Sequence, residues 1–547
     1  MMPVRRLLAA LVLLLAGPPL SAQVPAKDSL SPKETQKVGY VKASRIATAL
    51  GAGLLASATG FAAVAVGTSD GQYDAPQYGT RTKQGTAKNI ILLIGDGMGV
   101  THVTAARTRF YGSNGRLWLE RQPVLGSVTT YEVERKTSAS TPDIVVPVPD
   151  SASTGTSWAS GVKTYNAAVG KNAAAQTVAT IMEQAKQRGM RTGNVSTAEI
   201  TDATPAVMFS HVNVRGCQGP VFTTASCEAG DVPIAEQIAS NNVADVILGG
   251  GLSRFRPDEQ ALMTANGYKV LGSFGNPALA TQTAASQVVP TKTDLASVTG
   301  SDQRVIGLFN RGNMTVEKFK QDQPTSVQAK EPTVQEMTTK AIDLLSNSRQ
   351  GRQKGFFLQV EGALIDKRSH ANDAAQTLAE TKAFDDAVKS ALEFAKNDGN
   401  TLVIVTADHE CAGFNIIDKG SFANSEAAAP PSNVDSGNTS NNGSPVRQAA
   451  DNVKDVKRST GPVNGAAPGG TDPKNFAAAT FRVPSDPATV KDGSPEATLW
   501  LSYLSGNHTG ADVPIYASGP GSTSFDDHID NTAIYYRMRA ALRAFRN

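Results

Sequence analysis

Carboxylates and a histidine recur in this chain where buried β-strands are expected to end. The residues are Asp96, Glu361, Asp408 and His409, and they follow the largely apolar runs 88–94, 356–360 and 401–406. In open α/β sheets, ligands bind outside the carboxyl ends of parallel strands. One acid among glycines usually reflects only the chemistry of a turn. Several such residues arriving at one edge of one sheet predict a functional site.

A second pattern has the spacing of metal ligands. Asp366 and His370 stand four residues apart, so on a helical turn they share a face, as two ligands of one metal must. The same spacing also suits a simple helix-stabilising pair. Of the six histidines, three sit beside an acid or within a Gly/Thr turn, namely His370, His409 and His508. Histidine together with carboxylates suits zinc. The other three, His102, His211 and His528, are interpreted as structural or surface residues.

Ser151 is the candidate nucleophile. The segment 148–158 passes from a β-like Val/Pro stretch into small residues that can open a helix. Ser151 would then lie at a helix N-terminus, where free backbone N–H groups favour an anion. A serine in that place can attack an electrophile or hold a phosphate. The simpler alternative is that Asp150 or Ser151 only caps the helix.

Strand-like and helix-like segments alternate along the chain. Buried strands are expected at 88–94, 193–197, 243–248, 356–360 and 401–406, and helices at 174–189 and 371–396. This alternation predicts an α/β fold with a large, mostly parallel central sheet and helices on both faces. Residues 418–478 interrupt the alternation, because they are rich in small and polar residues and nearly lack large apolar ones. We interpret them as a flexible, low-complexity surface insertion rather than a binding segment.

The bulk composition excludes some classes of protein. The chain has 547 residues, which allows several domains or one large α/β domain with insertions. Hydrophobic residues make up 40% and charged residues 18%, as is ordinary for a soluble globular protein. The net charge of +3 comes from nearly balanced counts, and the chain has no basic run with interleaved aromatic residues. A nucleic-acid partner is therefore not expected.

The N-terminus reads as a secretory signal. Residues 1–22 combine a basic start, a short apolar run and small residues before the expected cleavage after Ala22. A second apolar stretch, 46–69, is just long enough to span a membrane but is only weakly hydrophobic. With the first segment cleaved, a second span would return the main domain to the cytoplasm. We therefore expect 46–69 not to span, with a working signal or an anchor as the alternative. Residues 23–87 are interpreted as an N-terminal extension. The expected location is secreted or periplasmic, or associated with the cell envelope.

The chain has three cysteines, which is few for its length. Cys217 and Cys227 flank a short loop and could close a small disulfide, which requires the oxidising compartment that export provides. Cys411 would then remain a free thiol.

Six motifs, taken together, resemble the alkaline phosphatase family. They are Ile94 to Gly99, Asp150-Ser151-Ala152, Asp202 to Pro205, Glu361 to Asp366, Thr406 to His409, and His508-Thr509-Gly510. They occur in the family's order, from Lys88 to the C-terminus, so 88–547 would form the catalytic domain around the 418–478 insertion. The resemblance implies an alkaline-phosphatase-like fold and hydrolysis of phosphate monoesters to an alcohol and inorganic phosphate. It also implies a phosphoserine intermediate, two Zn²⁺ and one Mg²⁺ per subunit, small phosphate monoesters as substrates, and a homodimer.

The resemblance also implies a role for each matching residue. Ser151 would be the nucleophile, and Arg215 would bind two phosphate oxygens in a bidentate fork. The metal ligands would be Asp366, His370 and His508 for one zinc, Asp96, Asp408 and His409 for the second, and Asp96, Thr204 and Glu361 for magnesium. Asp202 and Lys367 match a pair found in many bacterial members, which holds the magnesium's water shell and reaches phosphate through water. Cys217 and Cys227 match a disulfide of secreted bacterial relatives.

The chain departs from the family's pattern just after Asp408-His409. It reads Glu410-Cys411-Ala412-Gly413 where some relatives have a second His and others a Thr. We expect Cys411, although near the zinc edge, to be a small buried thiol rather than a ligand.

Two other functions remain as alternatives. One is a phosphodiesterase or sulfatase of the same superfamily, but the sulfatase signature is absent, and Arg215 with the Asp202/Lys367 pair favours a dianionic monoester. The other is a phosphate-binding protein without turnover, against which the intact Ser151 and ligand positions argue.

Overall fold

The computed structural model describes residues 85–138, 140–219, 227–275, 286–300, 302–419, 479–494, 496–504 and 506–545. The expected signal at 1–22, the apolar stretch at 46–69, nearly all of the extension at 23–87 and residues 420–478 of the expected insertion lie outside them. None of the described helices is long and apolar enough to cross a membrane.

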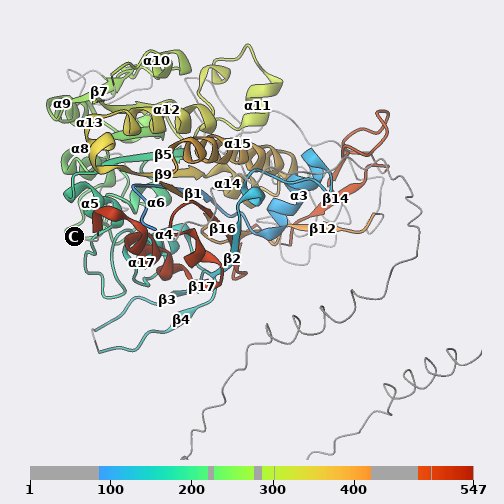
Figure 1. The fold of residues 1–547 in the computed structure, drawn as a ribbon, viewed down its shortest axis with the longest axis horizontal. Helices are drawn as coiled ribbons and strands as arrows, with labels where there is room; N and C mark the ends of the chain where they lie inside the picture. The colour runs from blue at the N-terminus through green and yellow to red at the C-terminus, as the bar shows by residue number, and fades with distance from the viewer. Residues whose placement is uncertain are drawn as a thin grey trace, which may run out of the picture. The chain divides into compact units, whose positions relative to one another are not determined.

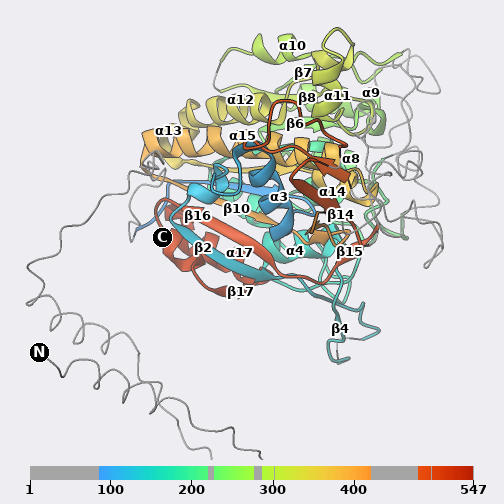
Figure 2. The same ribbon diagram turned by 90° about the vertical axis from the view of Figure 1, so that its right-hand side faces the viewer.

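A ten-stranded sheet of described residues forms the centre of the molecule, in the order β17-β2-β16-β10-β1-β9-β5-β6-β8-β7 (Figure 1). Its strands are β1 (Asn89–Gly95), β2 (Val124–Thr129), β5 (Arg191–Glu199), β6 (Val246–Gly250), β7 (Tyr268–Leu271), β8 (Arg304–Leu308), β9 (Phe356–Gly362), β10 (Thr401–Ala407), β16 (Val513–Ser518) and β17 (His528–Asp530). The seven strands from β10 to β7 pair in parallel. Only β16 runs antiparallel to both of its neighbours, β10 and β2, and Figure 2 shows it beside β2. The edge strand β17 pairs in parallel with β2. The expected mostly parallel sheet is confirmed.

The central strand β1 sets the register of the sheet. It lies between β9 and β10, and Gly95 at its end pairs with Gly362 on one side and Ala407 on the other. Every residue of these three strands is buried, as the continuous apolar runs predicted for a sheet covered on both faces. The three carboxyl ends therefore open at one level of one edge.

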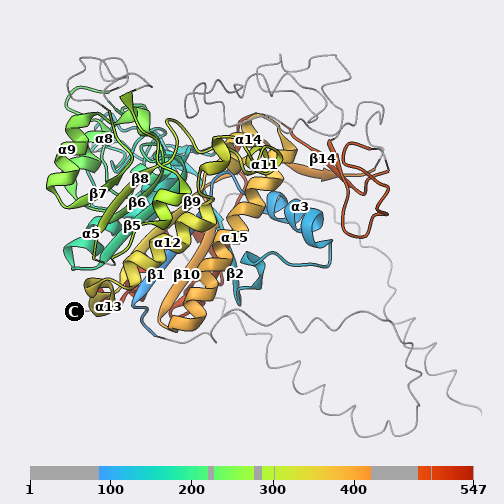
Figure 3. The ribbon, with the colours of Figure 1, turned by 90° about the horizontal axis from the view of Figure 1, so that it is seen from above.

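Helices cover both faces of the sheet. On one face lie α12 (Val334–Ser346) and α15 (Ala374–Asp398), which pack on each other and on the strands (Figure 3). On the other face lie α4 (Ser151–Ser160), α5 (Ile181–Gln187) and α17 (Asn531–Ala541) (Figure 1). The expected two-sided cover is confirmed.

One expected helix is much shorter than its pattern suggested. The prediction of a helix over 174–189 is wrong at its start, because α5 begins only at Ile181. Ala175 has a φ of 62°, in the left-handed region, and Lys171 pairs with Thr177 in an isolated β-bridge. The chain therefore makes a tight turn there. The capping box of Thr180 and Glu183 then fixes the start of α5. The helix expected at 371–396 begins at Ala374 and ends at Asp398.

Shorter elements complete the described fold. The remaining α-helices are α3 (Val100–Tyr111), α6 (Ala203–Ala206), α8 (Ile234–Asn241), α9 (Pro257–Ala265), α10 (Lys292–Ala296), α11 (Glu317–Asp322), α13 (Arg349–Lys354) and α14 (Leu364–His370). Short sheets comprise β3 (Glu132–Val133) with β4 (Val145–Val146), β11 (Glu410–Cys411) with β15 (His508–Thr509), and β12 (Asn415–Ile417) with β14 (Leu499–Ser502) and β13 (Ala479–Phe481). Of these, α14 and the β11–β15 pair position site residues.

Candidate active site

Asp96 and Asp408 leave the sheet side by side, directly after β1 and β10. Both are buried. The Asp408 Oδ1 atom accepts hydrogen bonds of 2.9 Å from the backbone N–H groups of Gly97 and His409. These bonds fix the carboxylate, so its second oxygen, Oδ2, faces His409 Nε2 at 3.0 Å. His409 Nε2 also lies 3.8 Å from Asp96 Oδ1. Asp96, Asp408 and His409 form a cluster with the composition and spacing of a metal site.

Ser151 faces this cluster from the first residue of α4. Its Oγ lies 3.2 Å from His409 Nε2, and the side chain is buried. The helix is capped by Asp150, whose carboxylate accepts a hydrogen bond of 2.9 Å from the Ser153 N–H. The simple capping role thus belongs to Asp150, which leaves the Ser151 hydroxyl at the cluster and the helix N-terminus beside it.

A second cluster is built on α14, which follows β9. Asp366 and His370 lie on one face of this helix, with Asp366 Oδ2 3.2 Å from His370 Nε2. His508 comes from β15, and its Nε2 lies 3.0 Å from His370 Nε2 and 3.5 Å from Asp366 Oδ1. Each histidine uses its other ring nitrogen on a backbone carbonyl, Gly506 for His370 and Pro149 for His508. Such bonds orient the rings of metal-binding histidines.

The two clusters touch each other through their histidines. The rings of His409 and His508 stack with centroids 3.6 Å apart. Groups that could bind two neighbouring cations therefore share one compact centre, as two-metal phosphoryl chemistry requires.

Electrostatics in this centre are dominated by crowded acids. Burial, followed by the charges of Asp408, Asp366 and Glu361, raises the pKa of Asp96 well above its ordinary value. For Asp366, burial acts in the same sense, but His370 and His508 outweigh it and hold its pKa well below the ordinary value. In return, although burial opposes the charged form, Asp366 raises the pKa of His508 to about 9. Positive charge on His508 thus helps to balance the acids when nothing else is bound.

The third expected ligand set lies behind the first cluster. Thr204 is on α6 and Glu361 is on β9, and both are buried. Glu361 accepts a hydrogen bond from Ser196 Oγ. Burial, the largest cause, raises its pKa to about 7, and the charges of Asp202 and Asp408 add to the rise. Oxygen donors of this kind suit Mg²⁺.

Several atoms in these sets lack a hydrogen-bond partner among the described residues. They are Asp96 Oδ1, Asp366 Oδ1, Asp408 Oδ2, Thr204 Oγ1 and His409 Nδ1. Buried acceptors without partners cost free energy and call for an explanation. The four oxygens belong to the residues that the sequence assigned to metals, and cations among them would satisfy the oxygens and neutralise the acids together. The residues present therefore fit two N/O-liganded cations and an oxygen-liganded one.

Arg215 lies between two acids at the mouth of the centre. Its guanidinium binds Asp202 Oδ1 at 2.7 Å and Asp150 Oδ2 at 3.2 Å, while Lys367 Nζ binds Asp202 Oδ2 at 2.8 Å. Burial opposes ionisation of Asp202, but Lys367 and Arg215 outweigh it and lower its pKa. Two cations and their acids thus form a fixed network, and the Arg215 side chain is still 28% exposed. The second role of Asp150, on Arg215, was missed from sequence because nothing local links residues 150 and 215.

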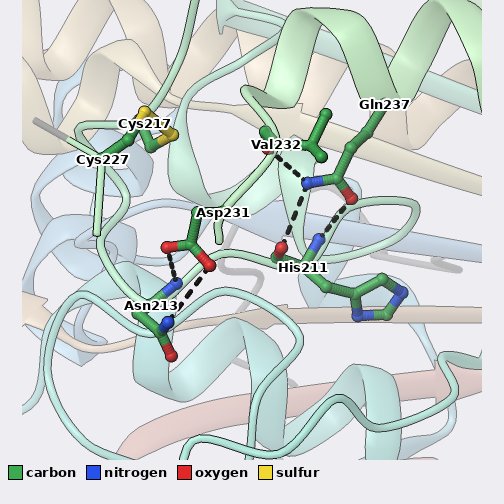
Figure 4. Close-up of a disulfide and its surroundings, with 7 residues drawn as sticks. All are labelled: His211, Asn213, Cys217, Cys227, Asp231, Val232 and Gln237. Carbon is green, nitrogen blue, oxygen red and sulfur yellow. Dashed lines mark hydrogen bonds between the residues drawn. A yellow bond between two sulfur atoms is a disulfide. The ribbon is translucent and has the colours of Figure 1, made fainter. Parts of the chain in front are cut away.

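The segment that carries Arg215 is pinned along its length (Figure 4). The expected disulfide between Cys217 and Cys227 is present. Upstream, Asp231 accepts hydrogen bonds from the backbone and side-chain nitrogens of Asn213 at 2.7 and 3.1 Å. Further upstream, Gln237 bonds both the N–H and the carbonyl of His211. These contacts limit the freedom of the backbone on both sides of Arg215.

Cys411 is closer to the second cluster than the sequence suggested. It is buried and free, as expected, and its Sγ lies with the donor atoms of Asp366, His370 and His508 in one group, all within 4.8 Å of one another. Burial, followed by Asp366, raises its pKa well above that of an ordinary thiol, so it is protonated when no cation is present. The sequence signal for this position was the cysteine two residues after the Asp408-His409 pair.

The other histidines lie apart from the two clusters. His102 is fully buried and bonds Ser369 Oγ at 3.0 Å. His211 pairs with Glu183 at 2.8 Å, and His528 is exposed near Ser127 and Asp512. These positions agree with structural and surface roles.

Comparisons with known proteins agree with this centre. The family model described as alkaline phosphatase matches residues 87–544. An alkaline phosphatase of Escherichia fergusonii is 38% identical over 487 residues, covering 83% of this chain and 86% of that protein. The alkaline phosphatase of Escherichia coli K12 is 37% identical with the same coverage. The solved alkaline phosphatase of Thermus thermophilus superposes with a TM-score of 0.61 at 21% identity, covering 88% of this chain and 96% of that one, and supports the fold.

Proposed function

The chain belongs to the alkaline phosphatase family and hydrolyses phosphate monoesters, and we propose that it does so through a phosphoserine on Ser151. The observation that carries the proposal is the position of Ser151 Oγ, 3.2 Å from His409 Nε2 and facing the first cluster. In this reaction Oγ attacks phosphorus, the bond to the leaving alcohol breaks, and water later releases phosphate from the serine.

We propose that the two clusters and the set behind them hold two zinc ions and one magnesium ion. Asp366, His370 and His508 would hold one zinc, and Asp96, Asp408 and His409 the other. Asp96, Thr204 and Glu361 would hold magnesium. When bound, these ions would supply Lewis acidity at the serine hydroxyl and at the leaving-group oxygen. Their support here is the set of unpartnered buried oxygens in those residues.

The chain's own residues bind and orient the phosphate. Arg215 is held by Asp150 and Asp202, so its remaining N–H groups are directed in advance and can bind two phosphate oxygens. The free N–H groups at the start of α4 add partial positive charge beside Ser151. Lys367 binds the other oxygen of Asp202, and we propose that it acts on phosphate through water. Once cations occupy the acidic clusters, Arg215, Lys367 and these cations together would favour a dianionic monoester over a monoanionic diester.

The proposal is tested with p-nitrophenyl phosphate at alkaline pH. We expect Ser151→Ala to lose about a thousandfold or more in rate, and prolonged EDTA treatment to abolish turnover until metal is restored. The matched control is Ser157→Ala, since that hydroxyl bonds only within α4 at 3.1 Å, and its rate should stay within a few-fold. Mass spectrometry of acid-quenched enzyme should find phosphate on Ser151. A rate for Ser151→Ala close to that of the control would contradict the covalent route.

We also propose that residues 1–22 are removed on export, that 23–87 form an extension, and that 88–547 are the catalytic domain of a homodimer. The disulfide between Cys217 and Cys227 supports an oxidising location, either secreted or periplasmic. N-terminal sequencing of the exported protein should then begin at Gln23. A start beyond residue 69 would instead make 46–69 the end of the working signal.

A further inference from the structure

Cys411 lies directly across a strand pair from a histidine of the second cluster. It is the last residue of β11, and in the antiparallel pairing with β15 its partner is His508. Its side chain is fully buried. The pairing fixes the backbone distance between the sulfur-bearing residue and His508, so their proximity does not depend on a flexible loop.

The sulfur belongs to a complete set of four donors. Asp366, His370, His508 and Cys411 each offer one ligand atom, and these atoms lie within 4.8 Å of one another. A second observation points to a cation among them, because Asp366 Oδ1, on a side chain 7% exposed, accepts no hydrogen bond from the described residues and has only a long contact of 3.5 Å with His508 Nε2. Oxygen, nitrogen and sulfur are all donors that zinc accepts, and its expansion to five-coordination leaves room for a substrate oxygen beside four protein ligands.

Gly97 shows that Cys411 and Asp366 share one small space. A Cβ built on Gly97 would lie 2.8 Å from Cys411 Cβ and 2.9 Å from Asp366 Oδ1. The glycine has a φ of +68°, so the turn after β1 both requires and provides this gap. The Sγ atom itself faces the Asp366 carbonyl at 3.7 Å, a contact weak enough to be exchanged for a metal bond.

We propose that Cys411 is a fourth protein ligand of the metal ion held by Asp366, His370 and His508. This inference rests on the proposed metal site and adds to it. On binding, the Sγ–H bond breaks, the proton passes to solvent, and an Sγ–metal bond forms. The sulfur makes this cluster selective for thiophilic ions, whereas the cluster of Asp96, Asp408 and His409 contains only oxygen and nitrogen donors.

Cobalt substitution tests the proposal without relying on activity. The chain has three cysteines and two form the disulfide, so Cys411 is the one source of a cysteine thiolate. The metal-free full-length protein is titrated with Co²⁺ while its absorption is recorded. Visible bands report that cobalt is bound, and a near-ultraviolet sulfur-to-cobalt charge-transfer band reports a thiolate ligand. We expect both in the wild type.

The variants distinguish the loss of a metal ligand from the loss of the fold. Cys411→Ser and Cys411→Ala should keep the visible bands and lose the near-ultraviolet band, and affinity for Cd²⁺ should fall about tenfold or more. The Cys217→Ser/Cys227→Ser double variant is the matched control and should keep the band, because it retains Cys411. Circular dichroism checks that each variant is folded. Since the serine variant is nearly isosteric, it keeps the test usable if the alanine variant fails to fold.

Each outcome has one meaning. Visible bands without a near-ultraviolet band in the wild type would overturn the role of Cys411 and leave the proposed metal site intact. Absence of visible bands in the folded wild type would overturn the metal site, and with it this inference. A near-ultraviolet band that persists in both Cys411 variants would also overturn it.

Discussion

The central sheet buries acids both at the amino ends of its strands (the amino edge) and at their carboxyl ends (the carboxyl edge). The acids at these two edges are neutralised in different ways. At the amino edge, Asp245 is 1% exposed and its Oδ1 is bound by Lys186 at 2.6 Å, Arg304 at 3.1 Å and Arg191 at 3.2 Å. Its Oδ2 accepts a hydrogen bond of 3.0 Å from the Thr192 N–H. At the carboxyl edge, Asp96, Asp366 and Asp408 are equally buried, yet each keeps an oxygen without a hydrogen-bond partner among the described residues.

The difference distinguishes a structural acid from a functional one. Lysine and arginine side chains of the chain itself neutralise Asp245, so this acid needs no added cation once the protein has folded. The acids of the carboxyl edge crowd together, and the pKa of Asp96 is raised by burial and by its neighbours. Such a cluster is stable only with protons or with added cations. Burial alone therefore does not identify a site, whereas burial with unsatisfied acceptors does.

The largest effect is expected at the carboxyl edge, on activity and metal content. Asp96→Asn should lower kcat/KM for p-nitrophenyl phosphate about 10³- to 10⁴-fold, or about 4–5.5 kcal/mol, because Asp96 is common to two proposed metal sites. Metal content should fall, while the metal-free variant should unfold at a temperature no lower than the metal-free wild type, since like-charge repulsion is relieved. Elemental analysis and thermal unfolding check both. Normal metal content in the variant would contradict the assignment.

The second effect should appear at the amino edge and in stability alone. Asp245→Asn leaves Lys186, Arg191 and Arg304 without their shared counter-charge, so the free energy of unfolding should fall by about 3 kcal/mol. Urea unfolding measures this loss. Metal content and kcat at a temperature where the variant is folded should stay within a few-fold of the wild type. A loss of metal from this variant would mean that the two edges are not independent.

The last effect concerns how the stability of the carboxyl edge depends on pH. Burial raises the pKa of Glu361 from 4.5 in the unfolded chain to about 7 in the folded one. The unfolded chain therefore releases this proton at lower pH, so the stability that the protonated group provides is full below about 4.5 and is lost as pH rises through about 7. In EDTA, Glu361→Gln should be more stable than the wild type by up to about 3 kcal/mol at pH 8, with little difference at pH 4.5.

The control for the pH experiment comes from the amino edge. Asp245→Asn should lower stability at both pH values, so the difference between pH 4.5 and pH 8 should remain close to that of the wild type. Urea unfolding at the two pH values, with chelator present, gives all the quantities needed. A Glu361→Gln protein with the wild-type pH dependence would show that another group is responsible for it.

The sequence was most informative where strand direction and chemistry coincide. Asp96 and Asp408 follow apolar runs, and parallel pairing with equal register brings such residues together. Asp245 has the same side chain but fell inside the strand expected at 243–248. The structure starts β6 only at Val246, which places Asp245 before the strand and at the opposite edge. The spacing of Asp366 and His370 predicted that they share a helical face, and α14 contains both residues.

Contacts between distant segments were less accessible. The pattern over 174–189 looked helical, but a turn at Ala175 prevents a helix before Ile181, and tertiary contacts outweigh propensity there. The contact of Asp150 with Arg215 and the position of Cys411 beside the donor atoms of Asp366, His370 and His508 depend on loops and on the β11–β15 pairing. Periodicity describes one segment at a time and contains no information about such pairs.

The central place of β1 also determines when activity can arise during synthesis. Asp96 is made early, but its strand lacks both neighbours until β9 and β10 have been translated, and His508 arrives later still. Contacts of such long sequence separation form late in folding. A nascent or prematurely terminated chain that stops before β15 therefore has neither the full set of ligands nor the pairing partner of β11. On the proposed ligand assignment, activity therefore requires that nearly the whole chain has been made.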